Sequence, residues 1–152
     1  MPVHRDRREL PYTPAQLYDL VADVEKYPRF LPWCVAARVR KREARLLVAD
    51  LAIGFRMIRE HFTSRVSLTP DGEDGMRIDT THADGPFRSL DSTWIFRPHA
   101  GGCEIDFHVA FAFRSPILQR AIESLFSEAV RRMVAAFEGR AKALYGEGTG
   151  RV

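Results

Sequence analysis

The chain has 152 residues and a mass of 17.3 kDa, the size of one ordinary domain. Its 45% apolar and 28% charged residues exclude a disordered chain, and a mean hydropathy of −0.24 argues against an integral membrane protein. The formal net charge of +3 is too small to indicate a nucleic-acid-binding protein by itself. Cys34 and Cys103 form no zinc or redox motif, so we expect two buried thiols. No apolar signal segment opens the chain, and we therefore expect a cytoplasmic protein.

The first elements are predicted to be a strand and a capped helix. Residues 3–10 alternate weakly between polar and apolar side chains, as in a strand. Thr13, Pro14 and Gln16 then supply an N-cap, a first-position proline and the partner of a capping box. Apolar residues follow at helical spacing, which predicts an amphipathic helix over residues 13–24.

Prolines interrupt the next segment. Pro28 and Pro32 disfavour the helical conformation at the residues before them. We therefore expect residues 27–33 to hold at most one short helical turn.

A long region of period two follows, from residue 34 to residue 113. Turn signals at residues 70–72, 84–86 and 98–102 help divide it into about six strands. The alternation is cleanest over residues 103–113, which predicts a half-buried antiparallel strand.

The last element is predicted to be a long helix that begins at Ser115-Pro116 and ends at Gly146. About 31 helical residues would span roughly 46 Å, enough to cross most of a sheet. Its expected buried stripe consists of Leu118, Ile122, Leu125, Ala129, Met133, Ala136, Phe137 and Leu144.

These elements predict an α+β fold, in which a curved antiparallel sheet of six or seven strands wraps around the long C-terminal helix. We expect residues 1–146 to form a single domain and residues 147–152 to form a flexible tail.

Three segments resemble the coenzyme Q-binding START-domain family. Residues 10–34 (LPYTPAQLYDLVADVEKYPRFLPWC) resemble its opening, residues 85–96 (GPFRSLDSTWIF) its central strand motif, and residues 127–141 (SEAVRRMVAAFEGRA) its closing helix. The resemblance covers nearly the whole chain in one order. It implies a helix-grip (START/Bet v 1-like) fold with a tunnel between sheet and helix.

The resemblance also implies a choice of functions. Some members of the family are implicated in binding ubiquinone and supporting respiration. A related bacterial branch, the ribosome-association toxins, is described as blocking subunit joining. More distant relatives are polyketide cyclases and aromatases.

The expected ligand-binding residues are the large apolar side chains of successive strands and of the facing helix. Their pattern alone fits a filled core as well as a lined cavity; the resemblance favours the cavity, with ubiquinone as the bound ligand. The set consists of Phe62, Trp94, Phe96, Phe107, Phe111, Leu118, Ile122, Leu125, Met133 and Phe137.

No catalytic or metal-binding residue is expected. The chain has no nucleophile, nucleotide or zinc motif, and its five histidines show no metal-ligand spacing. We interpret His82 as a buried, hydrogen-bonded histidine. Glu60 and Asp91 are the candidate carboxylates, and Glu60 faces inward only if the alternation of its strand is unbroken. A non-enzymatic protein is therefore favoured.

Two surface features have both a plain and a functional interpretation. Tyr27, Phe30 and Trp33 form either a lip at the tunnel mouth, in contact with a membrane, or a packed plug. One strand face is expected to carry Arg38, Arg40 and Arg42. This face is either simply solvated, or it docks on anionic lipids of the inner membrane, or it holds the phosphates of a ribosomal subunit. The oligomeric state is left open.

Overall fold

The computed structural model describes residues 3–31, 33–55 and 58–146. The expected flexible tail, residues 147–152, lies outside the described residues, as does Pro32. The helices are α1 (Pro14–Ala22), the 3-10 helix η1 (Val24–Arg29) and α2 (Pro116–Tyr145). The strands are β1 (Val3–Leu10), β2 (Cys34–Glu43), β3 (Leu46–Phe55), β4 (Ile58–Thr69), β5 (Met76–Asp84), β6 (Phe87–His99) and β7 (Gly102–Phe113).

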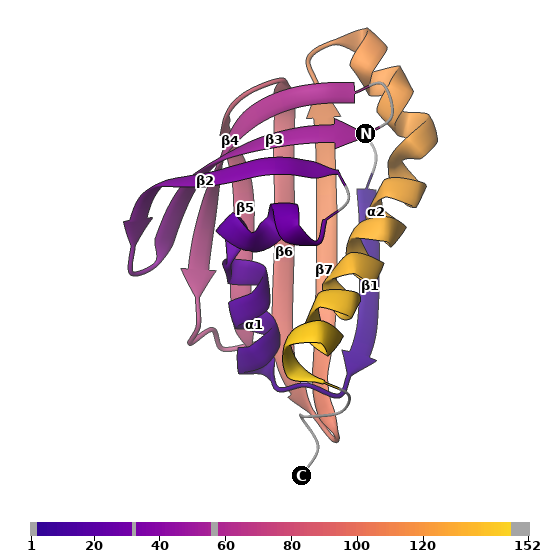
Figure 1. Cartoon of the computed structure of the whole chain (residues 1–152). Coiled ribbons are helices and arrows are strands. Elements are labelled where there is room, and N and C mark those ends of the chain that lie inside the picture. The colour runs from indigo at the N-terminus through magenta and orange to yellow at the C-terminus, as the bar shows by residue number, and fades with distance from the viewer. Residues whose placement is uncertain (1–2, 32, 56–57, 147–152) are drawn as a thin grey trace.

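All seven strands form one antiparallel sheet in the order β1-β7-β6-β5-β4-β3-β2. Figure 1 shows that β2, β3 and β4 curl across one end of the sheet, whereas α2 runs obliquely along the side of β1 and β7. The α1 and η1 helices lie against the concave face between them. The predicted α+β architecture, a curved sheet closed by one long C-terminal helix, is confirmed.

The start of α1 is as predicted, but its end is not. Gln16 N–H donates to the Thr13 hydroxyl at 3.1 Å, and Thr13 N–H donates to the Gln16 side chain at 2.9 Å, which completes the capping box. The helix ends at Ala22 rather than residue 24, because Asp23 leaves the α conformation. The chain then tightens into η1, which is six residues long. Only residues 27–29 of η1 fall in the segment 27–33, so the described part of that segment holds one short turn, as predicted.

The α2 helix begins at the Ser115 cap and ends at Gly146, as predicted, but its buried face was placed wrongly. Among the α2 residues whose side chains the structure describes, the buried ones are Ile122, Phe126, Val130, Val134, Phe137 and Ala141. Most of the predicted stripe is only half-buried, and Leu144 is 50% exposed. The predicted stripe therefore follows one flank of the buried face rather than its centre.

Aromatic side chains anchor the C-terminal half of α2. Phe137 packs edge-on against Trp94 of β6, with ring centroids 5.1 Å apart. The tyrosine hydroxyls tie the helix end to the α1 region: Tyr12 donates to the Gly146 carbonyl at 2.8 Å and Tyr145 donates to the Gln16 carbonyl at 2.9 Å. This end of the helix is thereby fixed on both the sheet and α1.

A bulge at Arg40 divides the expected basic row on β2. Before the bulge Arg38 is opposite Asp50, and after it Arg42 is opposite the buried Leu47. Positions 50 and 47 lie on opposite faces of β3, so Arg38 and Arg42 do as well. The prediction that the three arginines share one face is wrong, because the extra residue reverses the alternation.

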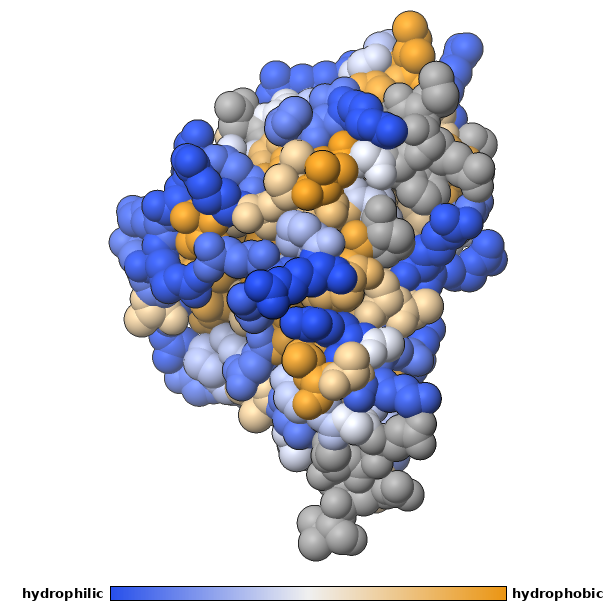
Figure 2. Space-filling model, viewed as in Figure 1, coloured by the Kyte–Doolittle hydropathy of each residue, from blue (hydrophilic) through white to orange (hydrophobic). Residues whose placement is uncertain are grey.

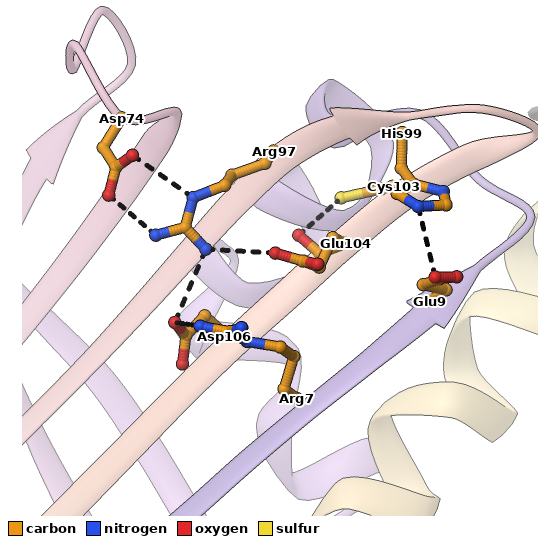
Figure 3. Close-up of polar contacts among 8 residues, drawn as sticks. All are labelled: Arg7, Glu9, Asp74, Arg97, His99, Cys103, Glu104 and Asp106. Atoms are coloured by element: carbon orange, nitrogen blue, oxygen red, sulfur yellow. Dashed lines mark hydrogen bonds and ion pairs between the residues drawn. The ribbon is translucent and has the colours of Figure 1, made fainter.

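An ion-pair network on the outer face joins segments that are distant in sequence (Figure 3). Arg97 of β6 contacts Asp74 at 2.7 Å, Glu104 at 3.2 Å and Asp106 at 3.4 Å, and Arg7 of β1 contacts Asp106 at 3.1 Å. The Arg97 guanidinium lowers the pKa of the Asp74 carboxyl. The network links the turn before β5 to β6, β7 and β1, away from the concave face.

The position of the α2 face is testable with two glutamates. Val134→Glu should lower the free energy of unfolding by about 3 kcal/mol or more, because a carboxylate without a partner is desolvated or forced to protonate. Leu144→Glu should change it by no more than about 0.5 kcal/mol. Urea unfolding of both variants measures the difference; equal losses would contradict the assigned face.

Candidate ligand-binding cavity

A cavity of about 160 Å³ lies between the N-terminal half of α2 and the curled strands. Every residue of its wall is apolar: Trp33, Ile53, Phe62, Phe87, Leu90, Val109, Phe111, Phe113, Ile122, Phe126, Ala129, Val130 and Met133. In the view of Figure 2, apolar surface is visible among charged side chains near the curled strands and α2. An engineered apolar cavity of roughly 150 Å³ in another protein stays dry and binds benzene, so this space suits a six-membered ring.

The cavity wall is made rigid by rings that pack against one another. Phe87 stands edge-on to Phe62 at 5.0 Å and stacks on Phe113 at 5.0 Å. Phe111 contacts Phe126 of α2 at 5.1 Å. These ring contacts connect β4, β6, β7 and α2 around the empty space. The strand side chains meet there because alternate residues of each strand point to the same face of the sheet.

The other half of the concave face is filled. Beside α1 only about 20 Å³ remains open. Trp94 lies 4.2 Å from Phe107, 6.0 Å from Phe96 and 5.1 Å from Phe137 between ring centroids. The small volume and the close rings describe a packed core rather than a binding site.

Eight of the ten predicted ligand-binding residues thus fall into two groups. Phe62, Phe111, Ile122 and Met133 line the large cavity. Trp94, Phe96, Phe107 and Phe137 lie beside α1 in the packed core. Leu118 packs against the cluster of Phe87, Phe113 and Ile122, whereas Leu125 is half-buried and lines neither space. Their roles toward a ligand remain predictions.

Sequence reasoning missed several wall residues. Leu90 and Phe113 lie on apolar rows that the sequence displays, and Phe87 belongs to the motif at residues 85–96. Phe126 and Val130 were missed because the expected helix stripe was displaced around α2. A spacing of four residues from Ile122 would have found both.

The aromatic segment before β2 behaves partly as a plug. The Tyr27 hydroxyl donates to the Val21 carbonyl, and its ring and that of Phe30 stand edge-on to Phe137 at 5.5 and 5.3 Å. Burial raises the pKa of the Tyr27 hydroxyl. Only Trp33 of this trio lines the cavity. Membrane contact by these residues stays a prediction.

Buried polar atoms without partners lie on the concave side. Among the described residues, four buried side-chain atoms have no hydrogen-bond partner: His4 Nε2, Trp33 Nε1, Ser64 Oγ and His82 Nδ1. The expectation of a hydrogen-bonded His82 is therefore wrong for this ring nitrogen.

The candidate carboxylates lie on opposite faces. β3 and β4 pair without a shift, so Glu60 lies opposite Ile53 and shares the inner face with Phe62, although Glu60 is not part of the cavity wall. Asp91 is exposed and lies next to the inward-facing Leu90 and Ser92, so it faces outward.

The structure offers little for covalent or metal chemistry. Burial raises the pKa of the Cys34 and Cys103 thiols to about 11, so both are protonated at neutral pH. Over the described residues, no group of three or more histidine, cysteine, aspartate or glutamate side chains is placed to hold a metal ion. No helix in the described part of the chain is long and apolar enough to cross a membrane.

The basic residues of β2 are mostly paired. Arg40 contacts Asp50 at 2.6 Å, and Arg42 contacts Glu25 at 2.9 Å. Hydrogen bonds from Thr63 and Arg40 lower the pKa of the Asp50 carboxyl. Arg38 and Arg40 also line an open groove of about 480 Å³ on the outer side of β2–β4. Docking of lipids or ribosomal RNA on this surface stays a prediction.

The match to known proteins covers most of this framework. A family model described as "Polyketide cyclase / dehydrase and lipid transport" matches residues 10–138. The chain belongs to this family. Membership confirms, at the level of the superfamily, the resemblance of the three sequence segments.

The curated relatives include a protein named as a toxin and a protein named for coenzyme Q binding. A protein of Rickettsia prowazekii named "Ribosome association toxin RatA" is 43% identical over 88% of this chain and 91% of its own length. A protein of Xenopus laevis named "Coenzyme Q-binding protein COQ10 homolog B, mitochondrial" is 32% identical over 94% of this chain and 59% of its own length.

Solved structures confirm the helix-grip fold. The 18 kDa protein CC1736 of Caulobacter crescentus matches with a TM-score of 0.74 and 35% identity, over 96% of this chain and 99% of the other. The ZhuI aromatase/cyclase of Streptomyces matches with a TM-score of 0.80 over 93% of both chains, but with 13% identity it shows the fold alone.

Filling the cavity tests whether its volume is free. Ala129→Leu should raise the free energy of unfolding by about 0.5–2 kcal/mol, because the larger side chain fills empty apolar space. Ala135→Leu, on the exposed side of the same helix, is the matched control and should be nearly neutral. A loss of about 1–3 kcal/mol in Ala129→Leu alone would indicate overpacking and contradict the free volume.

Proposed function

We propose that this chain is a non-enzymatic binding protein for a lipophilic molecule with a ring, and that this molecule is a ubiquinone-type quinone. The observation that carries the proposal is the apolar cavity beside a fully packed core. Protein interiors contain few voids larger than a water molecule. The wall of this 160 Å³ space presents apolar surface that no side chain of the protein covers, and an apolar ligand would cover it.

The size of the cavity limits what it encloses. It suits one six-membered ring, and it is too small for a long isoprenoid tail. We therefore expect the ring or the first isoprene units to lie inside and the remaining tail to pass out of the cavity. The relative named for coenzyme Q binding supports a quinone as the ligand.

The chemistry of the wall supports binding without catalysis. All of its residues are apolar, so a bound ring would touch neither a carboxylate nor a nucleophile of the wall. The two thiols remain protonated at neutral pH.

Ligand binding should raise the unfolding temperature. A ligand at about 100 times its Kd stabilises a protein by about 2.7 kcal/mol, which for a chain of this size is roughly 5–10 °C. Thermal unfolding with a short-chain ubiquinone measures the shift, and quenching of Trp33, at the cavity wall, follows binding. Ala129→Leu should abolish both signals. An unchanged midpoint at saturating quinone would contradict the proposal.

A second candidate function is association with a ribosomal subunit. The observation that favours it is the 43% identity to the protein named ribosome association toxin, over most of both chains. The outer groove with Arg38 and Arg40 supplies a surface for phosphates, although Asp50 reduces its positive charge.

Charge reversal at Arg38 tests this candidate. If the outer groove holds ribosomal RNA, Arg38→Glu should weaken co-sedimentation with purified subunits and reduce its salt dependence, without unfolding the protein. Arg88→Glu, exposed on β6, is the matched control. Equal co-sedimentation by both variants would exclude the groove, and a loss of binding to anionic vesicles alone would indicate a membrane surface instead.

A further inference from the structure

Two adjacent strands bring unpartnered polar side chains together on the concave face. Ser64 of β4 lies opposite His82 of β5. Ser64 is 0% exposed, and neither its Oγ nor the Nδ1 of His82 has a hydrogen-bond partner among the described residues. Buried polar groups in native proteins nearly always have a partner, so a missing one requires an explanation.

These atoms lie behind the wall of the apolar cavity and are not part of its lining. Phe62 of β4 and Leu90 of β6 line the cavity on either side of β5, and β5 contributes no residue to the wall. The His82 ring lies 6.2 Å from the ring of Phe87, which is part of the wall. The concave face of β5 between Phe62 and Leu90 is therefore polar, although the surrounding wall is apolar.

A third unpartnered atom belongs to the wall itself. The Nε1 of Trp33, a pure donor, is buried without a partner, and Trp33 lines the cavity. An apolar ligand would leave all three atoms unpaired.

We propose that Ser64 and His82 form the subsite for a ring oxygen of the quinone proposed above. This inference rests on the proposed function. A serine hydroxyl donates or accepts, and a histidine Nδ1 does either according to its tautomer. The pair therefore accepts a quinone carbonyl or a hydroquinone hydroxyl. Trp33 Nε1 offers a second donor to an oxygen.

Access requires a side-chain movement. Both atoms are covered in the ligand-free protein, so the ring oxygen reaches them only when a neighbouring ring changes rotamer. Phe62 is half-buried and adjacent to Ser64 on the same face, and it is the side chain that moves in this account. Rotamer changes of this kind are common on binding.

The test compares two ligands that share a decyl tail, one with a substituted quinone ring and one with a plain benzene ring that has no oxygen. Decyl-ubiquinone and decylbenzene carry the same tail, and their affinities are measured by calorimetry on the parent chain, Ser64→Ala and His82→Phe. Each variant should lose roughly 2- to 12-fold in quinone affinity, the range of one net hydrogen bond, and keep its affinity for decylbenzene. Ser67→Ala and His61→Phe, exposed on the opposite face of β4, are matched controls and should change neither affinity.

The ligand-free unfolding midpoint separates a binding role from a structural one. Removing an unpaired buried polar group should leave the midpoint unchanged or raise it. Lower midpoints with an unchanged preference for the quinone would mean that the two groups hold an internal water, and would overturn the subsite. Equal affinity of the parent chain for both ligands would also overturn the subsite, but it would leave the proposed binding of lipophilic molecules intact. If the parent chain bound neither ligand, the proposed function would be overturned as well.

Discussion

The contact between Phe137 and Trp94 fixes where α2 meets the sheet, and the rest of the interior depends on it. On the C-terminal side of this contact, α1 fills the space between helix and sheet, and the two tyrosine hydroxyls fasten the end of α2. On the N-terminal side no second helix enters, and the curled strands stand across from α2 (Figure 1). The sheet is long enough to span α2, whereas α1 has only nine residues. The α1 helix therefore covers one half of the concave face and leaves the other half unfilled.

Stability and binding are located in different parts of the molecule. The packed rings beside α1 and the Arg97 network on the outer face hold the strands together. The cavity and the unpaired atoms of Ser64 and His82 contribute nothing to stability in the ligand-free chain, since both are unfavourable without a partner. Features that weaken a fold locally are expected where a protein binds something. Membership of a family described partly by lipid transport agrees with this division.

Local patterns made most of the fold predictable, and features that depend on three-dimensional packing were not. Alternation located the strands, and the Thr13–Gln16 box located α1, because both follow from backbone geometry over a few residues. The bulge at Arg40 has no such signal, so one extra residue reversed the predicted face of Arg42. Trp94 and Phe62 lie on equally apolar rows, yet only Phe62 lines the cavity, because α1 covers the other. A filled core and a lined cavity therefore look alike in sequence. The missing hydrogen bond of His82 was not predictable either, because it depends on neighbours from other strands.

If the proposed function holds, a ring-bearing lipid occupies the cavity in the working protein. Mass spectrometry of an organic extract tests it most directly, on the parent chain and on Ala129→Leu purified side by side from a quinone-producing host. We expect a quinone in the extract of the parent chain and none in the extract of the folded variant. Absence of any lipid from the parent extract, together with no binding of added quinone, would contradict it.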